Sequence, residues 1–463
     1  MTAIAPTPSD LRAAVDALFP ALQADLEALV RIPGVSAASF DQARVASSAE
    51  AVAALLSGVG FDDVRILTAP KPDGTPGAPA VVARRQAASD DAPTVMLYAH
   101  HDVQPPGEGW ETEPFTPTIV GERMYGRGAA DDKAGIVAHV GALRALTALG
   151  AMPDVGITIF IEGEEEDGSP SFAAFLDQYR DLLAADVIVI PDSVNWKVGV
   201  PGLTTSLRGL VDGVVEVRVL DHAVHSGMYG GPILDANVLL ARLIATLHDD
   251  AGNVAVAGLV EGPSPTVDFD EATFRSEASL LDGVRLAGSG GIAEHVWVKP
   301  ALGVIGIDAT SVALASNTIA PSARAKLSLR LAPGQDPAAA AEALRAHLLA
   351  KAPFGAEVTF EVGSAGKPFL APIDTPAMRV ARGAFADAWG TDPVDIGVGG
   401  SIPFIADLLE VYPEADILVT GVEDPDSRAH GANESVHLGE LRRVVVAEAL
   451  MLARLAGAVE SSP

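Results

Sequence analysis

The chain has 463 residues, 49% of them hydrophobic, and its 31 basic and 61 acidic residues leave a net charge of -30. The length predicts two domains, because one hydrophobic core rarely serves so long a chain. The negative charge argues against nucleic acid or an anionic membrane as a partner, since both bind basic surfaces. The absence of cysteine excludes disulfides, thiolate metal sites and a cysteine nucleophile, so any metal must be held by His, Asp and Glu.

The start of the sequence contains no basic segment followed by an apolar one, so no signal peptide is expected. No stretch is apolar over the length that a membrane-spanning helix needs. We therefore expect a cytoplasmic protein.

Helical and strand patterns alternate up to about residue 204, and the strand at 94–103 is apolar enough to be central in a sheet. This alternation predicts a sheet covered by helices on both faces, with functional groups at the C-terminal ends of its strands. The expected elements, in chain order, are helices 9–31 and 41–58, strands 64–69, 80–85 and 94–103, helix 133–149, strand 156–163, helix 171–183 and strand 186–193.

From residue 205 the pattern changes to that of an α+β unit, and after residue 371 the first pattern returns. The second domain, 205–371, is therefore expected as an insertion between the two parts of the first, 1–204 and 372–463. Residues 250–300 are rich in glycine and carry no assignable pattern. The further expected elements are strand 209–220, helix 233–248, strands 309–316 and 324–333, helix 337–350, strand 356–362, helix 375–388, strand 416–420 and helix 439–456.

Four consecutive acidic residues, Glu164 to Asp167, lie shortly after the apolar run "VGITIF", in the motif "EGEEEDGS". Carboxylates at the end of a buried strand repel one another and resist desolvation, so something must compensate them. One explanation is solvent, in a charged loop that caps a helix beginning near Ser169. The other is bound cations, and this motif alone does not decide between them.

Further side chains of metal-ligand type follow other predicted strands or begin a predicted helix. Each alone has an ordinary explanation, as a helix cap, a turn residue or a core histidine. Together they form a nitrogen and oxygen ligand set for two divalent ions with one bridging carboxylate, and such ions would neutralise the acidic run. The residues are His100, His101 and Asp102 in "YAHHDV", Asp131 and Asp132 in "GAADDK", Asp192 in "VIPDS" and His430 in "SRAHGANE".

Eight motifs in order along the chain make the sequence resemble the metallopeptidase family M20. They are "HHDV", "YGRGAADDKAG", "EGEEEDGS", "IPDS", "HSGMYGG", "RLAPGQ", "GGSIP" and "AHGANE". These co-catalytic zinc hydrolases include carnosinase-like dipeptidases, aminoacylase, glutamate carboxypeptidases and the desuccinylase of lysine biosynthesis. The second, fifth and seventh motifs are most similar to the dipeptidase branch. The resemblance implies an α/β fold: a zinc-peptidase-like catalytic domain with a mixed sheet covered by helices, and an inserted α+β lid and dimerisation domain.

The resemblance also implies a role for each residue of the first domain that matches a motif. Glu165 is the general base, although a register shifted by one residue would make Glu164 the base and Glu165 a ligand. His101 and Asp132 occupy variable positions of their motifs. The implied ligands are His100 and Asp192 for one ion, Glu166 and His430 for the other, and Asp131 as the bridge, while Asp102 orients His100.

In the inserted domain, His225 matches a histidine that reaches the active site of a neighbouring subunit and polarises the scissile carbonyl. Arg330 and Ser401 match positions that hold the terminal carboxylate of the substrate, a task for which the guanidinium fork is suited. Asn317 is expected to help there, and Lys367 stands where some dipeptidases have a histidine. The resemblance thus implies a homodimer formed through the lid domain.

The function implied is metal-dependent hydrolysis of dipeptides, in which a water activated by two ions loses its proton to Glu165 and His225 helps to hold the oxyanion. An N-acyl amino acid amidohydrolase or a carboxypeptidase using the same centre is the alternative. A binding protein without activity would lack a ligand or the base, and a phosphoesterase would show basic residues near the acids; neither pattern is present. Zinc is the expected metal, and manganese or cobalt would also suit these ligands.

Overall fold

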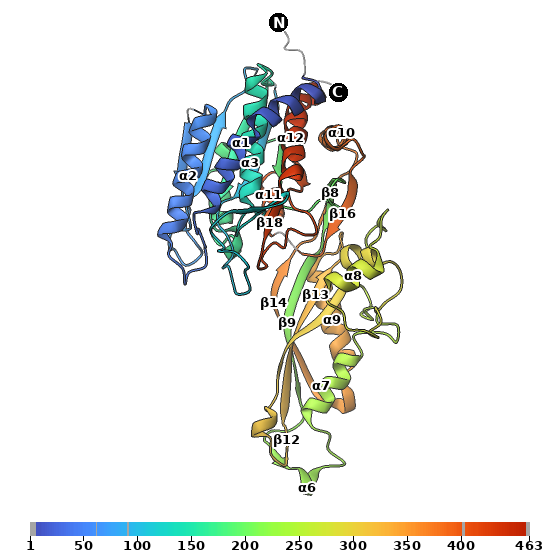
Figure 1. The fold of residues 1–463 in the computed structure, drawn as a ribbon. Coiled ribbons are helices and arrows are strands. Elements are labelled where there is room, and N and C mark those ends of the chain that lie inside the picture. The colour runs from blue at the N-terminus through green and yellow to red at the C-terminus, as the bar shows by residue number, and fades with distance from the viewer. Residues whose placement is uncertain (1–5, 62, 90–91, 401–402, 460–463) are drawn as a thin grey trace. The chain divides into compact units, whose positions relative to one another are not determined.

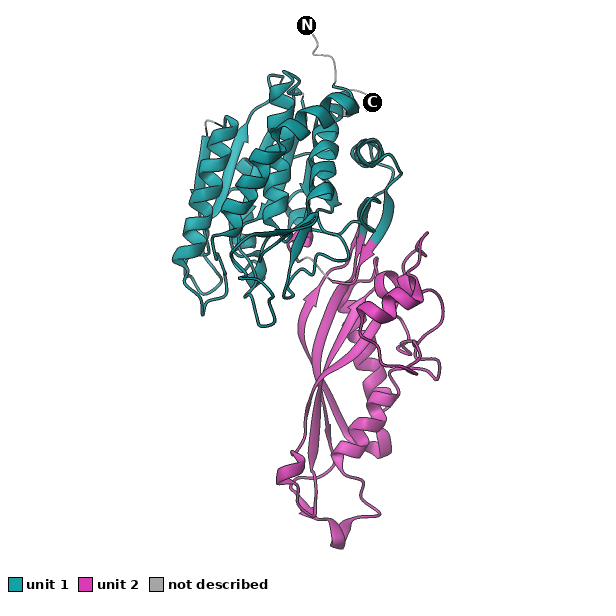
Figure 2. Ribbon diagram, viewed as in Figure 1, with its two compact units in different colours: residues 1–205, 371–396, 407–463 teal, residues 206–370, 397–406 magenta. Residues whose placement is uncertain are grey.

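The computed structural model describes residues 6–61, 63–89, 92–400 and 403–459, which form two compact units. Figure 2 colours unit 1, residues 1–205, 371–396 and 407–463, and unit 2, residues 206–370 and 397–406. Unit 2 thus consists mainly of a segment inserted between two parts of unit 1. The sequence-based domain boundaries, after residues 204 and 371, stay a prediction, because compactness alone defines these units.

The central sheet, most of whose strands belong to unit 1, is mixed. Strands β6, β3, β7 and β17 run parallel to one another, whereas β1, β2, β8 and β15 pair antiparallel. Strand β16 (Val394–Val398) pairs with β8 beside this row. The row, in spatial order, is β1 (Asp63–Leu67), β2 (Ala80–Arg85), β6 (Gly156–Glu162), β3 (Thr94–His100), β7 (Val187–Ile190), β17 (Asp416–Thr420), β8 (Gly202–Leu207) and β15 (Phe369–Leu370).

Helices cover this sheet, and α1 illustrates why the sequence folds as it does (Figure 1). Thr7 and Asp10 form a capping box at its N-terminus, and the apolar residues that recur every three or four positions are buried. Helix α3 packs against α1, α12 and β3. The helices of unit 1 are α1 (Pro8–Val30), α2 (Ala43–Val59), α3 (Lys133–Ala148), α4 (Phe172–Gln178), α5 (Arg180–Leu183), α10 (Pro376–Trp389) and α12 (Leu438–Val459), while α11 (Pro403–Val411) begins in unit 2 and ends in unit 1.

A small three-stranded sheet lies beside the central one in unit 1, in the order β18 (Ser435–His437), β5 (Arg123–Tyr125) and β4 (Thr118–Val120). The pairing of β18 with β5 places Ser435 opposite Tyr125, so the segment around residue 435 lies next to the segment around residue 125. The loops that lead into α3 and β18 therefore become neighbours, although about 300 residues separate them.

Unit 2 is built on an antiparallel sheet in the order β11 (Ala301–Asp308), β13 (Ser322–Leu331), β9 (Gly209–Arg218) and β14 (Glu357–Gly366). Alternate residues of β9 are buried, as expected for a sheet with one solvated face. Helices α7 (Ala236–Ala245) and α9 (Pro337–Ala350) pack their leucines on the buried face. Unit 2 also contains the short elements β10 (Val224–His225), β12 (Thr318–Ile319), α6 (Ser226–Tyr229) and α8 (Glu271–Glu277).

Most expected elements are present, but two expectations were wrong. The strand expected at 309–316 is absent, and its apolar residues Val312 and Leu314 are exposed by 96% and 78% in a short 3-10 helix. The strand in this region is β11, which ends at Asp308. The helix expected at 171–183 is divided into α4 and α5 at Tyr179, where the backbone leaves helical geometry.

Among the described residues, no helix combines the length and apolarity needed to cross a membrane.

Candidate metal centre

The expected ligands of unit 1 gather where three parallel strands end. His100 is the last residue of β3 and is paired with Glu162 at the end of β6. Leu97 of β3 is paired with Val189 of β7. Three residues further along each chain segment, the same register places Asp192 level with His100. Asp131 lies on the loop that enters α3. The C-terminal edge of the sheet therefore presents these side chains together.

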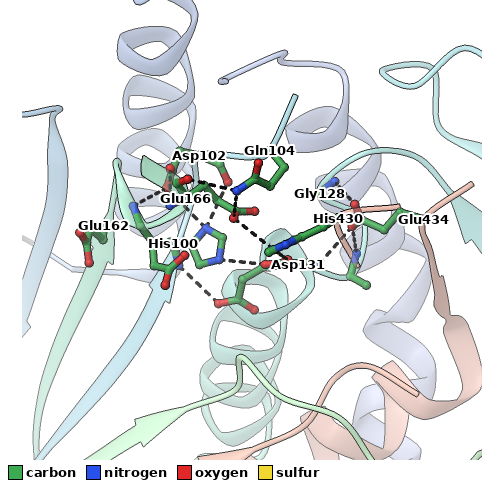
Figure 3. A network of polar contacts seen from close by, with 12 residues as sticks. His100, Asp102, Gln104, Gly128, Asp131, Glu162, Glu166, His430 and Glu434 are labelled. Carbon is green, nitrogen blue, oxygen red and sulfur yellow. Dashed lines mark hydrogen bonds and ion pairs between the residues drawn. The ribbon is translucent and has the colours of Figure 1, made fainter. Parts of the chain in front are cut away.

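Two groups of side chains place their ligand atoms within 4.8 Å of one another: His100, Asp131 and Asp192 in one, and Asp131, Glu166 and His430 in the other. Asp131 belongs to both groups. Its Oδ1 lies 3.0 Å from His100 Nε2, and its Oδ2 lies 3.0 Å from His430 Nε2 (Figure 3). His430 Nε2 also lies 3.2 Å from Glu166 Oε2. One carboxylate thus faces two histidines with different oxygens, as a bridging ligand would.

The orientation of the His100 ring suits a metal ligand. Its Nδ1 donates to the backbone carbonyl of Asp102 at 3.1 Å, so Nε2, 3.0 Å from Asp131, is the nitrogen that a metal ion could bind. Burial lowers the pKa of His100, but the hydrogen bonds with Asp102 and Asp131 outweigh it and raise this pKa well above its ordinary value, so a bound ion would replace the Nε2 proton. Asp102 is completely buried, and its carboxylate accepts from the backbone N–H groups of Glu165 and Glu166 at 3.2 and 3.0 Å. Asp102 therefore orients both His100 and the start of the acidic turn.

Gln104 is a site residue that the sequence analysis missed. Its side-chain amide donates to the carboxylate of Glu166 at 2.9 Å and to the backbone carbonyl of Glu166 at 3.1 Å. Figure 3 shows Gln104 directed at Glu166 from the loop after β3. The position two residues after Asp102 in "HHDVQ" is the only sequence signal for it.

The four acids of "EGEEEDGS" lie in different surroundings. The Glu164 carboxylate is 2% exposed and accepts from the backbone N–H groups of Ala78 and Ser171 at 2.9 and 2.8 Å, with Lys71 Nζ at 3.3 Å. It belongs to neither ligand group. Within the described part of the chain, the Glu165 carboxylate has no hydrogen-bond partner, and Glu166 belongs to a ligand group. This geometry favours Glu165 and Glu166 over Glu164 and Glu165 as the functional pair.

The ionisable groups of the centre shift one another's pKa values strongly. Burial raises the pKa of Glu165 well above its ordinary value, and the charges of Asp192 and Glu166 add to the effect. Burial and the charge of Asp131 raise the pKa of Asp192 to about 7. Conversely, contacts with Asp131 and Glu166 raise the pKa of His430 to about 11. Protons therefore compensate the crowded carboxylates, and divalent cations would do the same with the nitrogen and oxygen donors present. The residues fit such ions.

His101 and Asp132 are buried but belong to neither ligand group. His101 donates from Nε2 to the backbone carbonyl of Pro79 at 2.9 Å, and burial lowers its pKa to about 4, so it is a neutral core histidine. Asp132 accepts from the backbone N–H of His100 at 3.3 Å. Both therefore hold the framework around His100.

The other expected site residues belong to unit 2, apart from Ser401, which lies outside the described residues. His225 is exposed, and its Nδ1 accepts from the backbone N–H of Gly227 at 3.0 Å, so the ring proton is on Nε2. The backbone carbonyl of Asn317 accepts from Ser226 at 3.0 Å, which brings Asn317 next to His225.

Arg330 and Lys367 lie elsewhere in unit 2, on β13 and between β14 and β15. A further arginine, Arg208, was missed by the sequence analysis. It donates to the backbone carbonyls of His295 and Gly399 at 3.1 and 3.2 Å. Burial lowers its pKa to about 10, and the positive charge of Arg330 contributes. Two guanidinium groups that repel each other provide a suitable surrounding for an anion.

Comparison with known proteins identifies the family. The sequence model of the family described as "Peptidase family M20/M25/M40" matches residues 96–454. The chain belongs to this family. It is therefore a peptide hydrolase, and the resemblance inferred from the eight motifs is confirmed.

Several M20 relatives are dipeptidases. The chain is 35% identical over 412 residues to the cysteinylglycine-S-conjugate dipeptidase of Corynebacterium striatum, covering 88% of this chain and 89% of that protein. It is 27% identical over 400 residues to the β-Ala-His dipeptidase of Rattus norvegicus, covering 82% and 81%. The crystal structure of human carnosine dipeptidase 1 matches with a TM-score of 0.77 at 24% identity, over 98% of this chain and 100% of that chain. The predicted fold class is confirmed.

Proposed function

We propose that this M20 peptidase hydrolyses the peptide bond of dipeptides at a centre of two divalent ions, with Glu165 as the general base. One observation carries the proposal: two ligand groups share Asp131, whose two carboxylate oxygens face different histidines. Paired ligand sets joined by a single carboxylate are typical of two-metal hydrolases. The dipeptidases among its relatives support a small peptide as the substrate.

The donor set indicates which residues would hold which ion. His100, Asp131 and Asp192 would hold one ion, and Asp131, Glu166 and His430 the other. When bound, two such ions lower the pKa of water and polarise a carbonyl group. We propose zinc, and manganese or cobalt would suit the same nitrogen and oxygen donors.

Glu165 is the residue for proton transfer. Its carboxylate is not part of either ligand group and has a pKa raised by burial and by neighbouring acids, so it can both accept and return a proton. It would take a proton from the attacking water and deliver it to the leaving amine. Asp102 holds the backbone of Glu165 by a hydrogen bond of 3.2 Å, which keeps the base in place between these two transfers.

Residues of unit 2 would bind the rest of the substrate. With its proton on Nε2, His225 can donate a hydrogen bond to the carbonyl oxygen as negative charge develops there. Arg330 would pair with the terminal carboxylate, and the nearby charge of Arg208 favours an anion at this place. Ser401, Asn317 and Lys367 are proposed as further contacts of the substrate.

His225 and Arg330 cannot contact the same dipeptide within one copy of unit 2. His225 pairs with Thr318 of β12, which is followed directly by β13. Along β13, the eight residue-to-residue steps from Ser322 to Arg330 span about 26 Å at about 3.3 Å per residue. Figure 1 draws β12 and α6 at one end of unit 2, far from the end at which β13 finishes. A second copy of the chain would therefore supply His225, and we propose a homodimer formed through unit 2.

The substrate class is tested by comparing kcat/KM for a panel of dipeptides with that for the corresponding N-acetyl amino acids, in protein supplied with zinc. A dipeptidase hydrolyses the dipeptides with the higher kcat/KM. Faster hydrolysis of N-acetyl amino acids would instead favour an amidohydrolase using the same centre. Tripeptides with the same C-terminal residue serve as the control for carboxypeptidase action.

A further inference from the structure

Arg127 and Glu434 form a buried ion pair that joins two loops of the candidate metal centre. Arg127 precedes Asp131 by four residues, and Glu434 follows His430 by four. Arg127 Nη1 donates to Glu434 Oε2 at 2.5 Å, and the two side chains are 1% and 0% exposed. A buried pair of this kind costs desolvation and is weak evidence for added stability, so its hydrogen bonds must be considered individually.

The Glu434 carboxylate is surrounded by backbone donors of the loop that leads to Asp131. It accepts from the N–H groups of Gly128 at 3.1 Å, Ala130 at 3.0 Å and Asp131 at 3.2 Å. Figure 3 shows Glu434 beside this loop, on the side away from the His100 ring. One side chain therefore positions the backbone of the residue that both ligand groups share.

The Arg127 guanidinium makes the corresponding contacts with the loop of His430. Its Nη2 donates to the backbone carbonyls of His430 at 3.0 Å and Gly431 at 3.2 Å, and to that of Pro105 at 3.3 Å. The Trp110 ring lies 5.5 Å from the guanidinium. A planar fork is needed to reach several oxygen atoms at once, and a lysine ammonium cannot replace it.

The loop of His430 requires such support because its backbone is strained. Arg428, His430 and Asn433 have φ angles of 56°, 62° and 63°, in the left-handed region that residues other than glycine rarely adopt. Conformations of this kind persist only when surrounding contacts determine them. The contacts of Arg127 are one support of this loop. A second is the side chain of Asn433, which accepts from the backbone N–H of Glu111 at 2.8 Å.

We propose that Arg127 and Glu434 are positioning residues that fix His430 relative to Asp131 and thereby set the affinity for the ion held by Asp131, Glu166 and His430. This inference rests on the proposed function. Neither side chain belongs to a ligand group. The pair acts through backbone atoms, and its effect is unequal: Arg127 donates to the His430 loop and to Pro105, whereas Glu434 holds the backbone of Asp131, which serves both ions.

The test measures the two stepwise dissociation constants for Zn²⁺ by chelator competition, in metal-free full-length protein. Arg127→Lys keeps the charge but loses contacts with the His430 loop. We expect one constant to rise 10- to 100-fold while the other stays within about twofold, as is typical for partners that orient metal ligands. Glu434→Gln should raise both constants, because Asp131 contributes to both ions.

Glu448→Gln is the matched control. Glu448 is 3% exposed and forms a buried pair with His139 at 2.8 Å, and among the described residues it belongs to neither ligand group. Thermal unfolding of the metal-free proteins should show destabilisation in all three variants, whereas only Arg127→Lys and Glu434→Gln should lose zinc affinity. If Arg127→Lys does not fold, Glu434→Gln provides the same comparison.

The outcomes separate this inference from the proposed function. Unchanged zinc constants in Arg127→Lys and Glu434→Gln would overturn the inference, and so would an equal loss in Glu448→Gln, because the pair would then contribute only stability. Wild-type protein that binds fewer than two zinc ions would contradict the proposed function itself, and with it this inference.

Discussion

Replacing Glu165 by glutamine tests the role of the acidic turn most sharply. The change preserves the size of the side chain and removes only its ability to accept a proton. A positioned general base contributes about 10²- to 10⁴-fold to the rate, which corresponds to about 2.7–5.5 kcal/mol of activation free energy. We therefore expect kcat to fall by about three orders of magnitude. Both metal ions should remain, because Glu165 belongs to neither ligand group.

The surroundings of Glu165 also predict how this variant affects stability. Burial and the charges of Asp192 and Glu166 raise the pKa of Glu165, so the ionised carboxylate is unfavourable in the folded state without metal. Glutamine removes this unfavourable charge. The metal-free variant should therefore unfold at the same temperature as the wild type or at a higher one, although it is nearly inactive.

Glu164→Gln is the matched control, one residue away. Glu164 accepts from Ala78 and Ser171 and contacts Lys71, and glutamine has only one oxygen for these donors. A buried donor left without its partner costs about 1–3 kcal/mol, so this variant should be less stable. It should keep two ions and most of its turnover.

The assay combines kcat for a dipeptide, metal content by mass spectrometry and thermal unfolding of the metal-free protein. The reasoning is refuted if Glu165→Gln loses an ion while Glu164→Gln keeps both ions and loses turnover. That result would assign the base to Glu164 and a ligand role to Glu165.

Three further predictions follow from the same structure. Asp131→Ala should remove metal and activity together, whereas Asp132→Asn should leave metal content nearly unchanged; metal analysis giving the reverse would exchange their roles. His225→Ala and Glu165→Gln homodimers should each be nearly inactive, but refolding them together should restore about a quarter of wild-type activity, because half of the random dimers contain one complete site. No recovery in proven heterodimers would exclude action across the dimer. His101, with a pKa lowered to about 4 in the fold, binds its proton more readily when unfolded. The free energy of unfolding, measured by denaturant titration, should therefore fall by about 3 kcal/mol as the pH drops from 6.5 to 4. This decrease should be lost in His101→Gln. The same decrease in the variant as in the wild type would contradict the assignment of His101 as a neutral buried histidine.

The central strands could be predicted from the sequence because burial on both faces demands continuous apolar residues. Strands β3, β6 and β7 are almost entirely buried and correspond to the apolar runs before His100, Glu162 and Asp192. Strand β11 could not be found in this way, since most of its side chains are exposed and glycines interrupt it. Val312 and Leu314 misled the prediction because apolar residues usually indicate burial, and here they are exposed.

The candidate site could likewise be predicted from the sequence only in part. Strand ends and motif spacing indicated which side chains would gather, and the structure brings His100, Asp131 and His430 together. Their catalytic and ligand roles stay predictions. Gln104 and Arg127 could not be predicted, because their partners are 62 and 307 residues away and no local pattern records such contacts.

The most direct test of the account is a metal titration of dipeptide hydrolysis. Zinc is added to metal-free protein in steps from zero to three equivalents per chain, and the initial rate is measured at each step. The account predicts no hydrolysis without zinc and a plateau at two equivalents, because both ligand groups contribute to the reaction. Full activity without zinc, or a plateau at one equivalent, would contradict a centre of two ions.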